Sequence, residues 1–177
     1  MKRIRTPLTP KVIADLKAGD AVLLSGIVYT GRDQAHARLV AAMKAGRKLP
    51  FDPVGQVIYF CGPTKTPPGR VIGSCGPTTS KRMDAFSPAL LEKGLSGMIG
   101  KGSRSESVVS AIKKYRGVYF LAYAGCGALI SRYVRSCRVF AYAALGPEAI
   151  YRLEVKNLPL IVGVDSEGRN IYEGLKP

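Results

Sequence analysis

Residues 21–45 read AVLLSGIVYTGRDQAHARLVAAMKA, a largely apolar stretch that leads into a helical pattern. The first part, Ala21–Tyr29, is rich in strand-forming apolar residues and predicts a strand buried on both of its faces. From Thr30 onward the pattern predicts a helix, with Thr30 and Asp33 as a capping pair at its start and Gly46 at its end. A buried strand that leads directly into a helix points to a layered α/β domain.

Strands and helices alternate along the rest of the chain in the same way. We expect strands at Val54–Cys61, Leu95–Ile99, Val118–Ala122 and Val139–Ala143, and a closing hairpin formed by Leu158–Val164 and Asn170–Tyr172. We expect helices at Ser80–Lys93, at Val108–Tyr115 behind a Ser103–Glu106 capping box, and at 147–155 with Pro147 in the first turn. This alternation implies an α/β domain with a mainly parallel or mixed sheet. No linker or internal repeat divides the sequence, so we read residues 1–177 as a single domain.

The composition argues against several classes of protein. Apolar residues make up 46% of the chain, which is too many for an intrinsically disordered one. The uncharged stretch Val118–Ile130 is too short for a membrane span and is typical of a buried core segment. The basic N-terminus is not followed by the apolar run of a secretory signal. We therefore expect a cytoplasmic protein with no membrane partner.

The cysteines and the one histidine form no spacing that is typical of a metal site. Cys61, Cys75, Cys126 and Cys137 include no C-x-x-C pair, and we interpret them as packed thiols in a reducing compartment. His36 falls on the first predicted helix, and we interpret it as structural rather than catalytic. A Ser-His-Asp or Cys-His arrangement could be built only through that histidine. We predict no metal site in this chain.

The charge is strongly positive, with 27 Lys and Arg residues against 12 Asp and Glu residues and a net charge of +15. Such an excess is typical of proteins that bind nucleic acid, an acidic protein surface or an anionic ligand, and an even spread of charge can also serve solubility. The basic residues do not form a dense tail, and most aromatic residues sit inside apolar, strand-like runs. A basic nucleic-acid-binding protein is the non-enzyme alternative, beside a stand-alone module that binds phosphate or carboxylate.

Three cations, Arg32, Arg82 and Lys101, lie at or near the starts of predicted helices. A helix N-terminus carries about half a positive charge, so a cation there is unfavourable unless negative charge is close. Nearby carboxylates could compensate each cation locally (Asp33, Asp84 and Glu106). Alternatively, the free N–H groups and cations of loops that follow strands form one anion site, in which two arginine forks suit carboxylates. On that basis we predict a pocket for a small polyanion such as a dicarboxylate or a phosphate.

The segments that carry these cations have a family resemblance. They read Gly31-Arg32-Asp33-x-Ala35-His36, Gly76-Pro77-Thr78-Thr79-Ser80-x-Arg82-Met83-Asp84 and Gly100-Lys101-Gly102. Together they resemble the β subunit of class I, iron–sulfur-dependent fumarate hydratases, and L(+)-tartrate dehydratase β subunits share the pattern. The likeness covers nearly the whole chain, and the long second segment is its most specific part.

The resemblance implies a three-layer, swivelling β/β/α domain with a mixed sheet, which pairs with a separate α subunit in an α2β2 or similar assembly. It also implies that the α subunit holds a [4Fe–4S] cluster on three cysteines that are not expected in this chain. The implied reaction is a hydro-lyase reaction of the tricarboxylic acid cycle, the reversible dehydration of malate to fumarate. The open iron of the cluster would act as a Lewis acid on the leaving C2 hydroxyl. Malate and tartrate both present two carboxylates and a hydroxyl, so both stay open as substrates.

The resemblance also implies roles for individual residues. Thr78 looks like the family's proton-abstracting hydroxyl, with Lys101 and helix N–H groups as its activators. Arg32 and Arg82 would bind the substrate carboxylates, with Gly31 as a further substrate-binding position, and Lys101 would add a positive charge and a hydrogen bond. Such a subunit would be active only with its α subunit, and part of its positive charge is expected to face a more acidic α chain.

Overall fold

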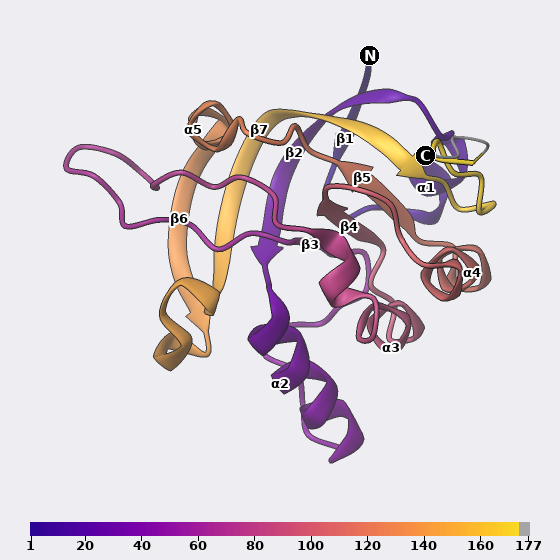
Figure 1. Cartoon of the computed structure of the whole chain (residues 1–177), viewed down its shortest axis with the longest axis horizontal. Coiled ribbons are helices and arrows are strands. Elements are labelled where there is room, and N and C mark those ends of the chain that lie inside the picture. The colour runs from indigo at the N-terminus through magenta and orange to yellow at the C-terminus, as the bar shows by residue number, and fades with distance from the viewer. Residues whose placement is uncertain (174–177) are drawn as a thin grey trace.

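The computed structural model describes residues 1–173, which form a mixed sheet with helices packed against it (Figure 1). In this part of the chain the strands follow the order β1-β2-β3-β4-β5-β7-β6. The strands are β1 (Lys2–Arg5), β2 (Ala21–Thr30), β3 (Val57–Tyr59), β4 (Gly97–Gly100), β5 (Val118–Leu121), β6 (Val134–Ala141) and β7 (Ile150–Val164). The helices are α1 (Pro10–Asp15), α2 (Asp33–Lys44), α3 (Ser87–Glu92), α4 (Glu106–Tyr115) and α5 (Gly127–Ile130), with short 3-10 helices at Ser80–Met83, Ser131–Tyr133 and Ala143–Glu148.

The long strand β7 closes part of the sheet into a ring. Strands β2, β3, β4 and β5 pair in parallel, one after the next. β7 runs antiparallel to both β2 and β5, so it joins the two ends of this parallel group. β1 and β6 extend the sheet beyond the ring, by pairing with β2 and β7. The sheet therefore forms two β layers, and α2, α3 and α4 add a third layer (Figure 1). This confirms the predicted α/β fold with its mixed sheet.

Ring closure buries both faces of the central strands. Tyr59 and Phe120 point into the ring, where they meet apolar side chains of β2 and β7. Their chain neighbours Ile58 and Tyr119 point outward and pack against the helices. Because successive side chains of a strand alternate between its faces, a strand with two buried faces must be apolar throughout. This is why these short strands are readable from their composition.

The helix predicted after Tyr29 is present as α2, although its start differs from the prediction. Gly46 follows the helix with a left-handed φ of 65°, as expected of a residue that ends a helix. Thr30 does not cap the helix. Its Oγ1 donates to the carbonyl of Ala149 at 3.3 Å and accepts from the N–H of Tyr151 at 2.9 Å. Thr30 therefore ties the end of β2 to the start of β7.

The helix predicted for Ser80–Lys93 is broken in two. Ser80–Met83 forms a 3-10 helix, and α3 begins afresh with Pro88 in its first turn. Proline lacks the N–H that a helix interior needs, so it favours a new helix start at this point. Likewise α4 begins after Ser105, two residues later than its predicted cap, because the carboxylate of Asp84 accepts the Ser105 N–H at 2.7 Å.

The prediction for residues 147–155 is wrong, because most of this segment belongs to β7, a strand of 15 residues. Pro147 lies in the 3-10 helix that precedes the strand and does not start an α-helix. Leu153 and Val155 are buried while Glu154 between them is exposed, which is the alternation of a strand. Pro147 is typical of a first helical turn, which is why the sequence of this segment also fits a helix. None of the helices in residues 1–173 is long and apolar enough to cross a bilayer.

We predict that Leu153→Ala destabilises the protein strongly, because Leu153 is fully buried inside the ring and stands in register with Val28 of β2. Urea unfolding should show a loss of about 2–5 kcal/mol in the free energy of unfolding. Val139→Ala on β6 is the matched control, since Val139 is 49% exposed, and it should change this value by at most about 0.5 kcal/mol. Equal losses in the two variants would contradict the closed ring.

Candidate functional site

The carboxyl ends of β2, β3 and β4 lie together at one edge of the sheet. The parallel register pairs Thr30 with Tyr59, and Tyr59 with Ile99. The segments that follow these strands therefore start side by side. Arg32 comes directly after β2, where α2 continues from the strand (Figure 1), and Lys101 comes directly after β4. The sheet itself brings these two cationic segments together.

The third cationic segment, Gly76–Arg82, is fastened to the same edge by backbone hydrogen bonds. The N–H of Thr78 donates to the carbonyl of Phe60 at 2.7 Å. Thr79 pairs with Lys101 in the manner of a parallel strand. Thr78 and Lys101 thus stand on adjoining backbone segments.

The Arg82 side chain reaches across between two of these segments, whereas Arg32 pairs with a residue outside them. Arg82 Nη2 donates to Thr78 Oγ1 at 2.7 Å and lies 3.4 Å from Asp33 Oδ2. Arg32 Nη2 lies 3.6 Å from Glu148 Oε1. Both ion pairs are long and partly exposed, and Arg32 Nε is buried without a partner. The site therefore keeps guanidinium donors that are not fully used.

Asp33 and Glu148 also belong to this cluster, although the sequence did not reveal it. The sequence indicated Asp33 as a capping partner of Thr30 and a local partner of Arg32, whereas it pairs with Arg82 from a distant segment. Glu148 lay in the segment misread as a helix. Its carboxylate accepts the N–H of Gln34 at 3.0 Å and so caps the start of α2. The alternation of residues 153–155 was the signal that could have placed Glu148 just before a strand beside β2.

Only one of the three cations lies at the N-terminus of an α-helix. Arg32 is the N-cap residue of α2. Arg82 lies in a 3-10 helix, and Lys101 follows β4 well before α4 begins. Asp84 does not compensate Arg82, because it binds Arg104 instead. Parallel strands and backbone hydrogen bonds, not a shared helix geometry, gather the cations.

A buried hydroxyl network holds the backbone of Lys101. Ser80 Oγ accepts the N–H of Lys101 at 2.9 Å. The Tyr119 hydroxyl lies 2.9 Å from both Ser80 Oγ and the carbonyl oxygen of Gly102. Ser80 and Tyr119 are fully buried, so each hydrogen bond is costly to lose. This network locks the segment with Thr78 onto the segment with Lys101.

The buried guanidinium of Arg104 packs against this network and stabilises it. The Arg104 guanidinium is in contact with the rings of Phe60 and Tyr119, with centroids at 5.2 and 5.0 Å. Its Nε donates to Asp84 Oδ1 and its Nη2 donates to Ser87 Oγ, both at 2.7 Å. A buried cation that is paired and hydrogen-bonded in this way fixes its neighbours in place.

His36 is fully buried behind Arg32 and supports the start of α2. Its Nδ1 lies 2.8 Å from the carbonyl oxygen of Arg32, to which it donates as the neutral imidazole. Burial lowers the pKa of His36 to about 4, so the ring is uncharged at neutral pH. Gly31 leaves room for this ring, since a Cβ there would lie 3.1 Å from the ring carbon Cε1. The N–H of Gly31 donates to the carbonyl of Tyr59 at 3.0 Å and is not available to a ligand.

The cysteines do not fit an iron–sulfur cluster. Cys61, Cys75 and Cys137 face the core inside the ring, and Cys126 stands apart before α5. The neighbouring Cys75 thiol and burial hold the pKa of Cys61 well above its ordinary value, whereas the hydrogen bond with Cys61 lowers the pKa of Cys75. Among residues 1–173, no group of three His, Cys, Asp or Glu side chains is placed to hold a metal ion.

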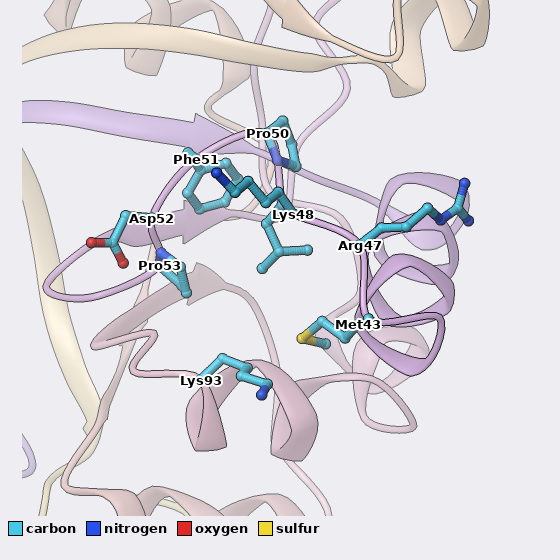
Figure 2. Close-up of a pocket in the computed structure, with 10 residues that line it drawn as sticks. Met43, Arg47, Lys48, Pro50, Phe51, Asp52, Pro53 and Lys93 are labelled. Carbon is cyan, nitrogen blue, oxygen red and sulfur yellow. The ribbon is translucent and has the colours of Figure 1, made fainter.

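A separate hollow of about 580 Å³ lies at the far end of α2, where Met43, Arg47, Phe51 and Lys93 line it (Figure 2). α2 has 12 residues and is therefore about 18 Å long. The helix thus separates this hollow from Arg32, and the hollow is not part of the cationic cluster.

Known proteins resemble this chain along almost its whole length. A family model described as fumarase C-terminus matches residues 2–175. A protein of Methanocaldococcus jannaschii named "Putative L(+)-tartrate dehydratase subunit beta" is 40% identical over 172 residues, which cover 94% of this chain and 88% of that protein.

Longer proteins match over only part of their length. An aerobic class I fumarate hydratase of Escherichia coli is 38% identical over 155 residues, or 86% of this chain and 28% of that protein. Fumarate hydratase 2 of Leishmania major is 35% identical over 162 residues, or 90% of this chain and 28% of that protein. The chain therefore spans somewhat more than a quarter of these two hydratases and most of the tartrate dehydratase subunit.

The buried His36 predicts a defined pH dependence of stability. Its pKa is about 4 in the folded chain, against an ordinary value of 6.5. Between these pH values only the unfolded chain binds the proton, so acid favours unfolding. The stabilisation that comes from keeping His36 neutral is therefore complete above pH 6.5 and is lost as the pH falls to about 4. The loss due to this group should be about 3 kcal/mol of the free energy of unfolding.

Urea unfolding of the native chain and of His36→Asn across this pH range tests the effect. The variant should lose less stability than the native chain as the pH falls, because the carboxylates contribute equally to both. Parallel curves for the two proteins would mean that His36 does not carry the dependence.

Proposed function

Because the chain belongs to the fumarase C-terminus family, we propose that it is the carboxylate-binding and proton-abstracting subunit of a hydro-lyase. The proposed reaction is the reversible dehydration of a 2-hydroxy dicarboxylate, malate to fumarate. L(+)-tartrate is the alternative substrate, which the name of the M. jannaschii relative favours. The observation that carries the proposal is the contact of Arg82 with Thr78, beside Arg32 and Lys101 at one edge of the sheet.

Arg32 and Arg82 are proposed to bind the two carboxylates of the substrate. A guanidinium can hold a carboxylate through two parallel hydrogen bonds. The ion pairs with Glu148 and Asp33, at 3.6 and 3.4 Å, are too long for strong hydrogen bonds. Partly exposed pairs of this kind contribute at most about 1 kcal/mol, so a substrate carboxylate can displace them. Lys101, which forms no ion pair among the described residues, would add the positive charge that a dianion needs.

Thr78 is proposed to take the proton from C3 of the substrate. A threonine hydroxyl is a weak base unless its alkoxide is stabilised. The Arg82 guanidinium, which donates to Thr78 Oγ1 at 2.7 Å, stabilises negative charge on that oxygen. Arg82 is therefore proposed as an activator of Thr78 in addition to Lys101. In the reverse direction the Thr78 hydroxyl would return the proton to C3.

The other half of the active site is proposed to lie on a partner α subunit. No three cysteines among the described residues are placed to hold a metal ion, so the cluster that the resemblance implies would be held by that partner. The chain would be active only in the complex, of α2β2 or similar composition, in the cytoplasm.

Co-expression with the neighbouring α-type chain under anaerobic conditions tests this function. The purified complex should dehydrate malate to fumarate with a higher kcat/KM than it converts tartrate to oxaloacetate, and neither chain alone should do so. Faster turnover of tartrate would make the complex a tartrate dehydratase. An assembled complex with an intact cluster that acts on neither substrate would contradict the proposal.

Within this complex, Thr78→Val should lower kcat by about 10²–10⁴-fold, because valine keeps the branched shape but removes the base. Steady-state kinetics would show the loss, and size-exclusion chromatography would show that assembly is unchanged. Thr79→Val is the matched control, since the Thr79 side chain is exposed and makes no capping hydrogen bond. Near-native turnover of Thr78→Val would remove Thr78 from the chemistry.

A further inference from the structure

Two long segments of the chain contain no acidic residue. Neither residues 53–83 nor residues 107–147 include an Asp or a Glu, although the chain has 12 of them. The net charge of +15 is therefore uneven along the sequence. What matters for function is whether the fold brings parts of these segments together.

The fold joins them into one surface, formed by the loop 62–74, α5, the following 3-10 helix and β6. Figure 1 shows the loop as a long arm beside α5 and β6. The Cys75 N–H at the base of the loop donates to the Gly127 carbonyl at 3.2 Å. A hollow of about 450 Å³ lies between loop residues such as Arg70 and α5 residues such as Leu129. A second hollow of about 270 Å³, lined by Arg70 and Arg135, adjoins the first. We call this surface the basic face.

The exposed arginines of the basic face have no carboxylate partner. Among the described residues, Arg70, Arg132 and Arg135 form no ion pair, in contrast to the arginines of the candidate site. All three arginines line the second hollow. Like charges gathered around one hollow repel each other. An external acidic group would relieve this repulsion.

The basic face also exposes apolar side chains. Val71, Leu129 and Val139 are 47–49% exposed, and they make up half of the large apolar side chains exposed in the described chain. β6 is an edge strand that pairs with β7 on one side only, so its other edge keeps free backbone groups. Apolar groups among unpaired cations are typical of a surface that a protein partner covers. A surface that serves only solubility does not need them.

The basic face begins at the candidate site. The loop starts so close to Arg32 that a Cβ on Gly62 would lie 3.0 Å from the Arg32 Cδ. The same loop returns through Gly76 to Thr78, whose hydroxyl contacts Arg82. Both ends of this loop therefore lie at the candidate site, and the loop forms part of its rim.

We infer that the basic face is the surface on which the partner α subunit docks, through a patch of that subunit rich in Asp and Glu. This inference rests on the proposed function, which requires such a partner. Charge complementarity selects an acidic partner surface, and continuity with the rim of the site selects the subunit that completes it. Nucleic acid and a second copy of this chain are the competing occupants.

The test compares two double variants of equal charge change in co-purification and titration with the α-type chain. Arg132→Glu with Arg135→Glu reverses two cations of the basic face that line the same hollow. Arg3→Glu with Arg5→Glu reverses two exposed cations on β1, the edge strand at the other end of the sheet. The first pair should raise the Kd for the α chain at least about tenfold and flatten its salt dependence. The second pair should leave Kd within about threefold of the native value.

The outcomes separate this inference from the proposed function. If the native chain neither binds the α chain nor forms an active complex, the proposed function fails. If the native complex forms and is active but both double variants bind the α chain equally well, only the docking surface is overturned. The inference also fails if the basic-face variant loses binding to a random-sequence RNA, or loses self-association, while it keeps its affinity for the α chain. Thermal unfolding confirms that both variants are folded.

Discussion

The pairing of β7 with β2 on one side and with β5 on the other is the constraint on which the rest of the structure depends. It closes the parallel strands into a ring, so Tyr59 and Phe120 are buried inside while Ile58 and Tyr119 are buried outside. Strands held from both faces have little freedom to shift, and the carboxyl ends of β2, β3 and β4 are fixed side by side. The candidate site is built on those ends. Its precision therefore comes from the sheet and not from the loops themselves.

Around that edge the chain places cations and balances them only partly. Asp33 and Glu148 hold the two arginines through long ion pairs, which keep the guanidinium groups in place without using all their donors. The buried network of Ser80, Tyr119 and Arg104 braces the same loops from behind. Under the proposed function, the Asp33 and Glu148 carboxylates pair with the arginines until the substrate carboxylates displace them. The groups that bind and deprotonate the substrate come from this chain. The uncovered basic face beside them is consistent with a subunit that forms half of an active site.

The sequence predicted the parts of this fold in which local pattern and tertiary environment agree. Ala21–Tyr29 and the helix after it were readable because the strand is largely apolar and a surface helix must be amphipathic. The expectation that both faces of this strand are buried was wrong for most of its length, because Leu23, Ser25 and Ile27 are only half-buried. β7 was not readable, because Pro147 is typical of a helix start and this signal competes with the alternation of residues 153–155. Thr30 failed as a cap because it bonds to β7 instead. For the site, the motifs located Arg32, Thr78, Arg82 and Lys101. The pairing of Arg82 with Thr78 and Asp33 depends on segments that meet only in the folded chain, so local spacing could not reveal it.

The central claim is that Arg32, Arg82 and Lys101 together bind a dicarboxylate with its C3 beside Thr78. A crystal structure of the complex with the α subunit, with a non-reacting dicarboxylate analogue bound, measures this most directly. The account predicts that the ligand carboxylates lie at hydrogen-bond distance, about 2.7–3.2 Å, from the Arg32 and Arg82 guanidinium groups, in place of Glu148 and Asp33. A ligand bound elsewhere, with both arginines still paired to their own carboxylates, would contradict it.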